Sequence, residues 1–390
     1  MRIAVTGIGI VSAAGLNVAE NLATLRAGRS GIAPRPVRLA TRHCLPVGEV
    51  PLSNEELAAR LGIGELQSRT TLLGMMAAEE ALRDAGGVRP RTALVSSTSV
   101  GGMDLTECFF EEFARDERRG RLRMAAHHDC ADSTLAIARR CAVDGLTTTL
   151  STACSSAANA IGLAARLLRH GVADRVVAGG CDALCRFTLN GFKSLMILDE
   201  QPCRPFDASR AGLNLGEGAA YVVLERAGET AHRPYCYVAG FANANDAYHQ
   251  TASSPDGEGD FLAMSGALRQ AGIEPREVDW VNAHGTGTPN NDLAESRALR
   301  RLFGAELPPV SSTKATTGHT LAAAGAIEAV ISVLALHHGE CYPTLRFAEP
   351  DPEGDIRPLD CLTRSDLRCV LSNSFGFGGN CASLLLCREP

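Results

Sequence analysis

The sequence predicts an α/β protein built from two related halves, and three observations support this prediction. Apolar residues make up 45% of the 390-residue chain and 39 residues are glycine, a composition typical of strands and helices joined by tight turns. The chain is longer than one hydrophobic core usually supports. In addition, two of its segments recur about 160 residues further along the chain.

The recurring segments suggest where the two halves lie. The run Leu150-Ser-Thr-Ala-Cys, with the alanine-rich helical pattern that follows it, resembles Val310-Ser-Ser-Thr-Lys and its own alanine-rich continuation. Likewise, the strand-like run that starts at Gly216 resembles the run that starts at Gly378. A period of this length suits a duplicated α/β unit rather than a solenoid. We therefore expect halves over residues 1–228 and 229–390, meeting near Arg226 to Pro234, with function where their loops meet.

The elements of the first half follow from runs of β-branched residues that alternate with helical patterns. The N-terminal run after Arg2 is rich in glycine and β-branched residues, so we interpret it as a buried strand and not as a signal peptide. Gly101 opens a polar stretch that predicts a surface helix. The further expected strands cover 91–97, 147–150, 174–182 and 219–225, and the expected helices cover 72–85, 107–123 and the residues from 157 onward.

Charge and cysteine usage limit the possible functions. The net charge of −6 has no basic block, which argues against nucleic acid as a ligand. Fourteen scattered cysteines without a CxxC pair predict reduced thiols and a cytoplasmic protein. His127-His-Asp-Cys130 superficially resembles a metal site, but neighbouring residues on one element point in different directions, so we expect a helix start near the rim of the site and no metal. The apolar helix expected over 320–336 carries Glu328 at its centre and is not a membrane span.

Cys154 is the first candidate catalytic residue. The strand expected over 147–150 is buried and stops just before it, and the helix-forming residues from Ala157 begin just after it. A thiol at the start of a helix lies near unpaired N–H groups and the positive end of the helix dipole, which favour the thiolate. The alternative is a small buried apolar residue, the commonest role of a free cysteine.

Three stretches of the second half are candidates to reach Cys154. One buried strand ends at His284 and is followed by Gly-Thr-Gly-Thr, which holds the imidazole on rigid backbone beside open space. A short loop supplies Lys314 and His319, and the helix after it carries Glu328, a carboxylate in an apolar sequence that needs Lys314 as its partner. The glycine-rich turn over 372–379 is able to bring a backbone N–H close to a ligand.

Four motifs together resemble the β-ketoacyl-ACP synthases of the type I/II elongating class. They are Thr152-Ala-Cys-Ser-Ser, Asn282-Ala-His-Gly-Thr-Gly-Thr, Lys314-Ala-Thr-Thr-Gly-His and Asn373-Ser-Phe-Gly-Phe-Gly-Gly, and the similarity runs in order over essentially the whole chain. The resemblance implies the thiolase fold, a five-layer αβαβα arrangement of two pseudo-symmetric halves. This agrees with the internal repeat. A departure follows Gly379, where Asn380-Cys381 stands in place of the usual Thr-Asn.

The resemblance also implies a reaction, a decarboxylative Claisen condensation with malonyl-ACP that gives β-ketoacyl-ACP. Cys154 would take the acyl group from an acyl carrier protein, with the backbone N–H groups of Cys154 and Phe377 as the oxyanion hole. His284 and His319 would stabilise the enolate that forms when malonyl-ACP loses carbon dioxide. Lys314, paired with Glu328, would hold His319 in place. No cofactor or metal is implied.

Further expectations rest on the same resemblance. Thr286 and Thr288 match positions that bind the pantetheine arm. Phe192 and Phe377 match positions that line and gate the acyl pocket, and Asp292 matches a supporting acidic residue. The partners would be an acyl carrier protein and a second subunit, either another copy or a chain-length factor, with contacts near the nucleophile strand.

Other family assignments fit less well. The resemblance extends to the aryl polyene and flexirubin pigment subgroup. A chain-length-factor-like subunit with little activity of its own is the alternative, but such subunits typically lack the nucleophile. A priming synthase would carry Asn at His319, and a thiolase would carry a second cysteine within 373–379. A papain-like hydrolase does not explain the Lys314 and His319 pair.

Overall fold

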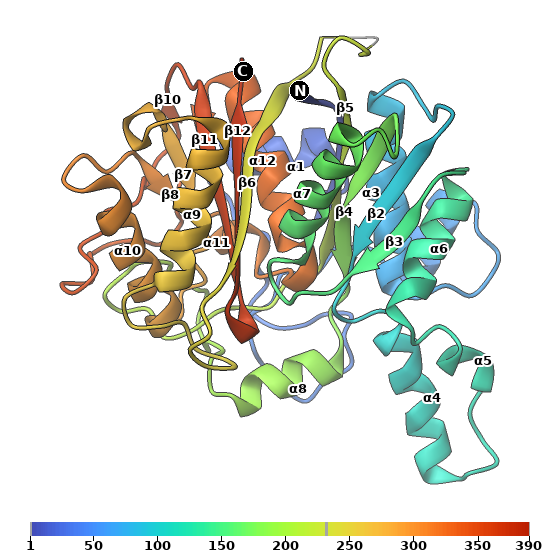
Figure 1. The fold of residues 1–390 in the computed structure, drawn as a ribbon. Helices are drawn as coiled ribbons and strands as arrows, with labels where there is room; N and C mark the ends of the chain where they lie inside the picture. Colours follow the sequence, from blue (N-terminus) through green and yellow to red (C-terminus); the bar gives the residue numbers. More distant parts are fainter. Residues whose placement is uncertain (1, 231–232, 390) are drawn as a thin grey trace.

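The computed structural model describes residues 2–230 and 233–389, and within them the main sheet has ten strands in the order β3-β2-β4-β5-β1-β6-β12-β11-β7-β8 (Figure 1). A separate pair of short strands, β9 and β10, lies outside it. The strands are β1 (Ile3–Ser12), β2 (Thr92–Ser97), β3 (Thr147–Leu150), β4 (Arg175–Asp182), β5 (Gly218–Arg226), β6 (Cys236–Asn245), β7 (Trp280–Asn282), β8 (Val310–Ser311), β9 (Glu340–Cys341), β10 (Thr363–Arg364), β11 (Cys369–Gly376) and β12 (Asn380–Cys387).

The order of strands in the sheet shows the predicted duplication, because each half contributes five strands in corresponding positions. Read outward from the centre, the first half runs β1, β5, β4, β2, β3 and the second runs β6, β12, β11, β7, β8. The strand directions match as well, because β4 and β5 pair antiparallel as β11 and β12 do, and β2 is parallel to β3 as β7 is to β8. Both repeats seen in the sequence fall on corresponding strands, β3 with β8 and β5 with β12. The expected seam includes residues 231–232, which lie outside the described residues.

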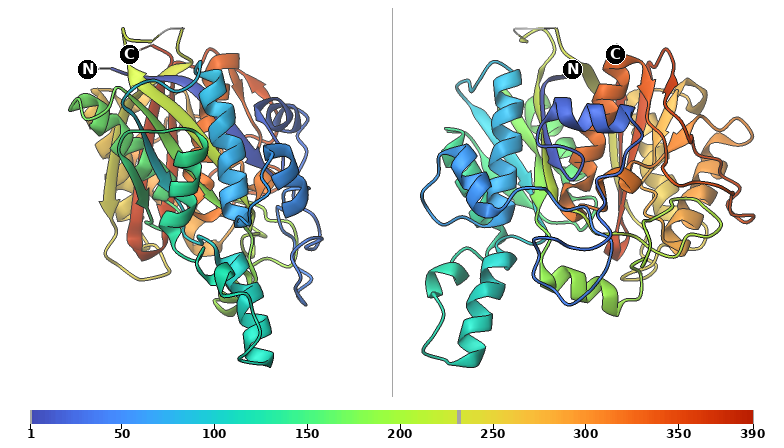
Figure 2. Two further views of the ribbon diagram at one scale, coloured as in Figure 1. Left: turned by 90° about the vertical axis from the view of Figure 1, so that its right-hand side faces the viewer. Right: turned by 180° about the vertical axis from the view of Figure 1, so that it is seen from behind.

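The helices form three layers around the two half-sheets (Figures 1 and 2). α3 packs on the outer face of the first half, with α6 against it, and α9 packs on the outer face of the second, with α10 against it. α7 and α12 lie between the halves and contact strands of both. The predicted five-layer αβαβα arrangement is therefore confirmed.

The layer helices are α3 (Arg69–Asp84), α6 (Cys130–Arg140), α7 (Ser156–Arg169), α9 (Glu258–Ala271), α10 (Pro289–Phe303) and α12 (Ala324–His338). The others are α1 (Val18–Arg26), α2 (Asn54–Leu61), α4 (Met103–Arg115), α5 (Leu122–Ala125), α8 (Arg186–Ser194), α11 (Lys314–Thr317) and the 3₁₀ turns η1 (Pro275–Glu277), η2 (Leu321–Ala323) and η3 (Phe377–Gly379).

The single helix expected over 107–123 is wrong. α4 begins earlier and ends at Arg115, because Asp116 is extended and Gly120 has a positive φ of 95°. The chain then turns back into the short α5, and the two helices project from the body as an arm (Figures 1 and 2). β3 also differs from expectation, since it is half-buried rather than buried. Among the described residues no strand pairs with its outer side, so it is an edge strand of the sheet.

The helix start expected at 127–130 is present. α6 begins at Cys130, and the Asp129 side chain caps it by accepting the Ala131 N–H at 2.7 Å. His127 bonds Asp132 at 2.9 Å, whereas His128 bonds Thr106 at 3.0 Å. The two imidazoles therefore turn to different partners.

The apolar helix of the second half belongs to the middle layer. By length and composition the helical stretch Leu321–His338 would be able to cross a membrane, but 89% of it is buried inside the structure. Its apolar surface packs against strands of both half-sheets. It is thus a core helix.

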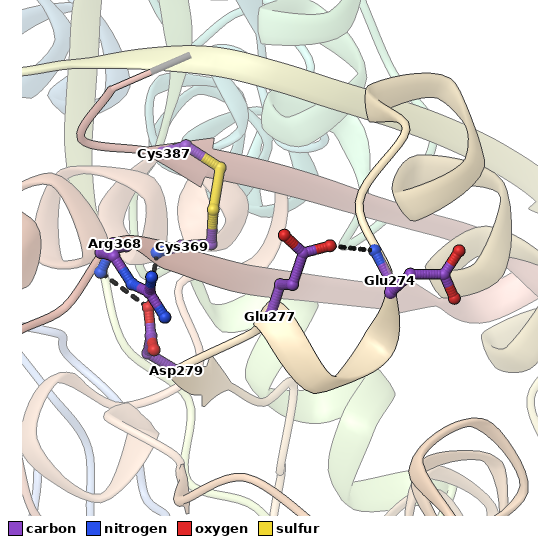
Figure 3. The surroundings of a disulfide bond; sticks show 6 residues. All are labelled: Glu274, Glu277, Asp279, Arg368, Cys369 and Cys387. Carbon is purple, nitrogen blue, oxygen red and sulfur yellow. Dashed lines mark hydrogen bonds between the residues drawn. A yellow bond between two sulfur atoms is a disulfide. The ribbon is translucent and has the colours of Figure 1, made fainter.

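The expectation that all the cysteines are reduced thiols is wrong for one pair. Cys369 at the start of β11 and Cys387 at the end of β12 are directly opposite in the antiparallel register and form a disulfide, with their Cα atoms 4.2 Å apart (Figure 3). Beside it, Asp279 accepts the backbone N–H groups of Arg368 and Cys369 at 2.7 and 2.9 Å (Figure 3). Residues 18 apart in sequence gave no sign of this pairing, because it depends on the register of the hairpin.

Candidate active site

Cys154 lies on a tight turn between β3 and α7. The residue before it, Ala153, has a φ of 52°, a left-handed conformation that costs a non-glycine residue of order 1 kcal/mol or more. Ser156 holds this turn, because its hydroxyl accepts the Thr152 N–H at 2.7 Å and donates to the Ala153 carbonyl at 2.6 Å. The strained turn places the thiol just before α7, as the sequence predicted.

Both predicted histidines meet this thiol. His319 Nε2 lies 3.1 Å from Cys154 Sγ. The rings of His284 and His319 are 5.3 Å apart and nearly perpendicular, at 85°. His284 follows β7, and His319 follows α11, so the second half supplies both imidazoles while the first supplies the sulfur. The juxtaposition expected from the sequence is present.

Lys314 contacts Glu328 as predicted but orients the other histidine. Its ammonium group donates to Glu328, to the His284 carbonyl at 2.6 Å and to His284 Nδ1 at 3.1 Å. The expectation that it holds His319 is wrong, because its short helix directs the side chain toward the end of β7. An ammonium group only donates, so Nδ1 accepts and the ring proton of His284 lies on Nε2.

Burial governs the protonation of the site. It raises the pKa of Cys154 to about 11, although the charge of Lys314 and the Phe377 N–H act in the opposite direction. The expected thiolate is therefore not the resting form of this thiol. Burial and the charge of Lys314 hold the pKa of His284 and the pKa of His319 well below the usual value. Burial raises the pKa of Glu328, and Lys314 opposes it. The resting site holds a thiol and two neutral imidazoles.

The glycine-rich turn between β11 and β12 brings Phe377 to the nucleophile. Phe377 and Cys154 line the same cavity, and the Phe377 N–H lowers the pKa of the thiol against the effect of burial. A side chain at Gly376 would lie 3.0 Å from the Cys154 backbone nitrogen, so glycine permits this close approach. The Phe377 ring stacks on Phe192 of α8 at 5.7 Å between centroids. Backbone donor and aromatic ring thus belong to one three-residue turn.

A cavity of about 280 Å³ opens onto Cys154, His284 and His319. Its apolar walls include Phe192, Phe377 and Leu213. Thr286 and Thr288 also line it, with their hydroxyls 2.9 Å apart. Asp292 lies behind them and is buried, and it accepts the Gly287 N–H at 3.1 Å and the Phe206 N–H at 2.8 Å. The structure therefore brings together every residue proposed from the sequence, with Asp292 supporting the loop rather than lining the cavity.

Two further residues support the site without having been assigned a role from the sequence. Glu295 of α10 is fully buried and accepts the N–H groups of His284 and Gly285 at 2.9 and 2.8 Å. The Asn373 side chain donates to the same carboxylate at 3.1 Å. Glu295 lies in an ordinary polar helical pattern, and only its three-residue spacing from Asp292 marks that face of α10 as buried.

Cys154, His284 and His319 are also a donor set that zinc can use, since their ligand atoms lie within 4.8 Å of one another. The tautomer of His284 does not suit a metal ligand. His284 Nδ1 is occupied by Lys314, so Nε2 carries a proton and lacks the lone pair that a metal needs. An N–H aimed into the cavity suits a negatively charged oxygen.

Comparison with known proteins agrees with this geometry. Residues 1–230 match the family model of the β-ketoacyl synthase N-terminal domain, and residues 235–348 match that of the C-terminal domain. The 3-oxoacyl-[acyl-carrier-protein] synthase 2 of Coxiella burnetii is 34% identical over 99% of this chain and 98% of its own length.

Solved structures are similar over the whole length as well. The ishigamide ketosynthase/chain length factor matches with a TM-score of 0.92 and 31% identity over 100% of this chain and 99% of its own. A type II polyketide ketosynthase, solved with its acyl carrier protein and bound to the hexaketide, matches with a TM-score of 0.88 and 26% identity over 99% of each chain. The chain therefore belongs to the β-ketoacyl synthase family and is a β-ketoacyl-ACP synthase of fatty-acid or polyketide elongation.

Proposed function

We propose that Cys154 carries the acyl chain and that His284 and His319 bind the enolate oxygen of the malonyl group. The observation that carries this assignment is the meeting of three groups at one end of the cavity: the Cys154 sulfur, His319 Nε2 at 3.1 Å, and the Phe377 N–H. Lys314 and Glu328 act through His284, whose tautomer they set.

The first step is transfer of the acyl group. Cys154 Sγ attacks the thioester carbon of acyl-ACP, and the N–H groups of Cys154 and Phe377 receive the oxygen of the tetrahedral intermediate. The bond to the pantetheine sulfur then breaks. Because the thiol is protonated at rest, its proton must leave as the new bond forms, and His319 Nε2 is the neighbouring base in line to relay it to the departing sulfur. Atoms balance as acyl-S-Cys154 and HS-ACP.

The second step is decarboxylative condensation. Malonyl-ACP enters with its pantetheine arm along the cavity wall that carries the hydroxyls of Thr286 and Thr288. Loss of carbon dioxide leaves an enolate whose oxygen accepts the Nε2–H of His284. It also accepts the Nε2–H of His319, once exchange with water has moved the proton of this neutral ring from Nδ1 to Nε2. Such donors each contribute about 3 kcal/mol to stabilising a developing oxyanion. The enolate carbon attacks the acyl carbon and the bond to Cys154 breaks. The sulfur then takes up one proton from water through His319, so the step balances as β-ketoacyl-ACP, carbon dioxide and the free Cys154 thiol.

The partners we propose are an acyl carrier protein and a second subunit. The second subunit would bind along β3. Two observations support an interface there: β3 is a half-buried edge strand, and the apolar side chains of Leu135 and Leu146 beside it are 48% and 46% exposed. We favour a homodimer because one chain holds the complete set of catalytic groups. A heterodimer with a chain-length factor is the second candidate, since the ishigamide relative is described with such a subunit.

Three further assignments complete the proposal. The halves divide at residues 228 and 229, between the end of β5 and the start of β6. The cytoplasm is the proposed location, because the relatives act in fatty-acid synthesis and the apolar helix lies in the core. The pathway we propose is polyene elongation of the aryl polyene type, supported by the motifs around 127–132 and by the flat aromatic walls of Phe192 and Phe377, which suit a planar unsaturated chain.

The test is acyl loading followed by mass spectrometry of the intact protein. Wild-type protein incubated with acyl-ACP is expected to gain one acyl group on Cys154, and Cys154→Ala is expected to gain none. His284→Ala is expected to load at nearly the wild-type rate but to lose malonyl decarboxylation by about 100-fold. Cys130→Ser, which lies outside the cavity, serves as the control. Loading that persists in Cys154→Ala would overturn the assignment, and a wild-type protein that neither loads nor condenses on its own would favour the chain-length-factor-like role.

A further inference from the structure

We propose that Ser156 is a positioning residue that orients the Cys154 N–H for the oxyanion of acyl transfer; this inference rests on the proposed role of Cys154. Ser156 is the first residue of α7 and is fully buried. Its hydroxyl donates to the Ala153 carbonyl at 2.6 Å. That carbonyl and the Cys154 N–H belong to one planar peptide group, so a bond to the oxygen fixes the direction of the N–H as well.

The Cys154 N–H points away from the Ser156 hydroxyl. In a trans peptide group the C=O and N–H bonds point in opposite directions, and the Ala153 carbonyl points toward this hydroxyl. The glycine-rich turn lies next to the nitrogen of the same peptide group, since a Cβ at Gly376 would be 3.0 Å from it. Gly376, Phe377 and Cys154 all line the cavity. The Ser156 bond therefore directs the N–H toward the space in which the oxyanion would form.

The backbone of the nucleophile turn does not hold this orientation by itself. Ala153 has a φ of 52°, and a left-handed alanine persists only where surrounding contacts maintain it. The Ser156 N–H also reaches the Ala153 carbonyl, but at 3.2 Å, so the hydroxyl makes the shorter of the two bonds. The same hydroxyl accepts the Thr152 N–H at 2.7 Å. It thus bonds two peptide groups of the turn at once, and its loss would loosen both.

The neighbouring Ser155 is a matched comparison, because its hydroxyl bonds a different peptide group of the same turn. It donates to the Thr152 carbonyl at 2.9 Å. This carbonyl shares its peptide group with the Ala153 N–H, which has no part in the proposed chemistry. Both serines are fully buried, so removal of either hydroxyl disturbs the turn. Only Ser156 acts on the peptide group that carries the Cys154 N–H.

Ser156→Ala separates acyl transfer from the other reactions of the site. Single-turnover acylation of Cys154 by acyl-ACP is expected to fall about tenfold, because the N–H loses its fixed direction but is not removed. Decarboxylation of malonyl-ACP uses the imidazoles of His284 and His319, and alkylation by iodoacetamide forms no oxyanion. Both rates are expected to stay within about twofold of wild type. The ratio of acylation to decarboxylation in one sample is independent of any unfolded fraction.

Ser155→Ala is the control, and its ratio of acylation to decarboxylation is expected to stay within about twofold of that of wild type. A wild-type ratio in Ser156→Ala would overturn the inference. An equal fall of the ratio in Ser155→Ala would also overturn it, because the stiffness of the whole turn would then matter and not the orientation of one peptide group. Failure of the proposed function is distinct, since wild-type protein would then take up no acyl group at Cys154.

Discussion

At the scale of single residues, burial keeps the Cys154 thiol and the imidazoles of His284 and His319 uncharged in the resting site. The thiol is buried, so its pKa is raised to about 11 by burial, against the charge of Lys314 and the Phe377 N–H. The helix start that suggested a thiolate from the sequence does not outweigh this desolvation. Cys154 therefore depends on a neighbouring base to remove its proton during the reaction and is not a thiolate beforehand.

This protonation state predicts how Cys154 reacts with iodoacetamide, which attacks thiolates. Below its pKa the thiolate fraction rises about tenfold per pH unit, so with a pKa near 11 the alkylation rate of Cys154 should still be rising between pH 8.5 and 10. The rate is measured by peptide mass spectrometry, with N-acetylcysteine as the reference thiol. A plateau below pH 8 would show that Cys154 rests as a thiolate.

Lys314 gives a second prediction at this scale. Lys314→Met leaves Glu328 buried without its partner and removes the donor that sets the His284 tautomer. We expect decarboxylation to fall about 100-fold and the free energy of unfolding to fall by about 3 kcal/mol, measured by urea denaturation. Adding Glu328→Gln should restore much of the stability but none of the decarboxylation. Recovery of both would mean that the pair is only structural.

The sequence predicted the chemistry of these residues better than their contacts. Cys154, His284, Lys314 and His319 each stand at a strand or loop end with a recognisable motif around it. Which histidine Lys314 touches depends on how α11 is rotated against β7, and sequence spacing does not determine that rotation. Glu295 was missed for a related reason, because a buried carboxylate in a polar helix looks like a surface residue until its backbone partners are known.

At the scale of elements, alternation and repeats predicted the strands of the first half and the duplication, but not β6, β9 or β10. They did not predict the register of the β11 and β12 hairpin, and therefore not the disulfide that depends on it. The bond between Cys369 and Cys387 closes a loop that contains the whole Phe377 turn. It joins the two strands at the end of the hairpin farthest from that turn, since Cys369 pairs with Cys387 and Gly376 with Asn380.

The disulfide predicts a stability that depends on redox conditions. Closing an 18-residue loop restricts the unfolded chain and stabilises the fold by about 3 kcal/mol. Cys387→Ser should therefore lower the urea midpoint, and a reducing agent should lower that of wild type to the same value. Cys361→Ser, which changes an exposed free cysteine, is the control. Titration of thiols under denaturing conditions before and after reduction counts the bond directly; no difference would mean that the cysteines are reduced in solution.

At the scale of the whole molecule, the two half-sheets supply one shared active site, and the outer edge of the first half-sheet is formed by β3. The outer face of each half-sheet is covered by helices and the middle is filled by α7 and α12. Within residues 2–230 and 233–389, in contrast, β3 pairs with a strand on one side only, and its last residue, Leu150, lies four positions before the nucleophile. A subunit that pairs there would hold in place the turn on which Cys154 sits.

We therefore predict that dimerisation and activity are lost together. Leu135→Asp and Leu146→Asp place carboxylates in the apolar surface beside β3, where burial in an interface is costly. Light scattering after size-exclusion chromatography should give the mass of two chains for wild type and of one chain for the variants, with condensation reduced about tenfold or more because the β3 turn loses its support. Val172→Asp, at an apolar side chain that is 50% exposed after α7, is the matched control and should remain a fully active dimer. Variants that stay dimeric would place the interface elsewhere. A wild-type protein that is monomeric alone and active only with a second subunit would favour the heterodimer, because the edge of β3 would then bind a different chain and not a second copy.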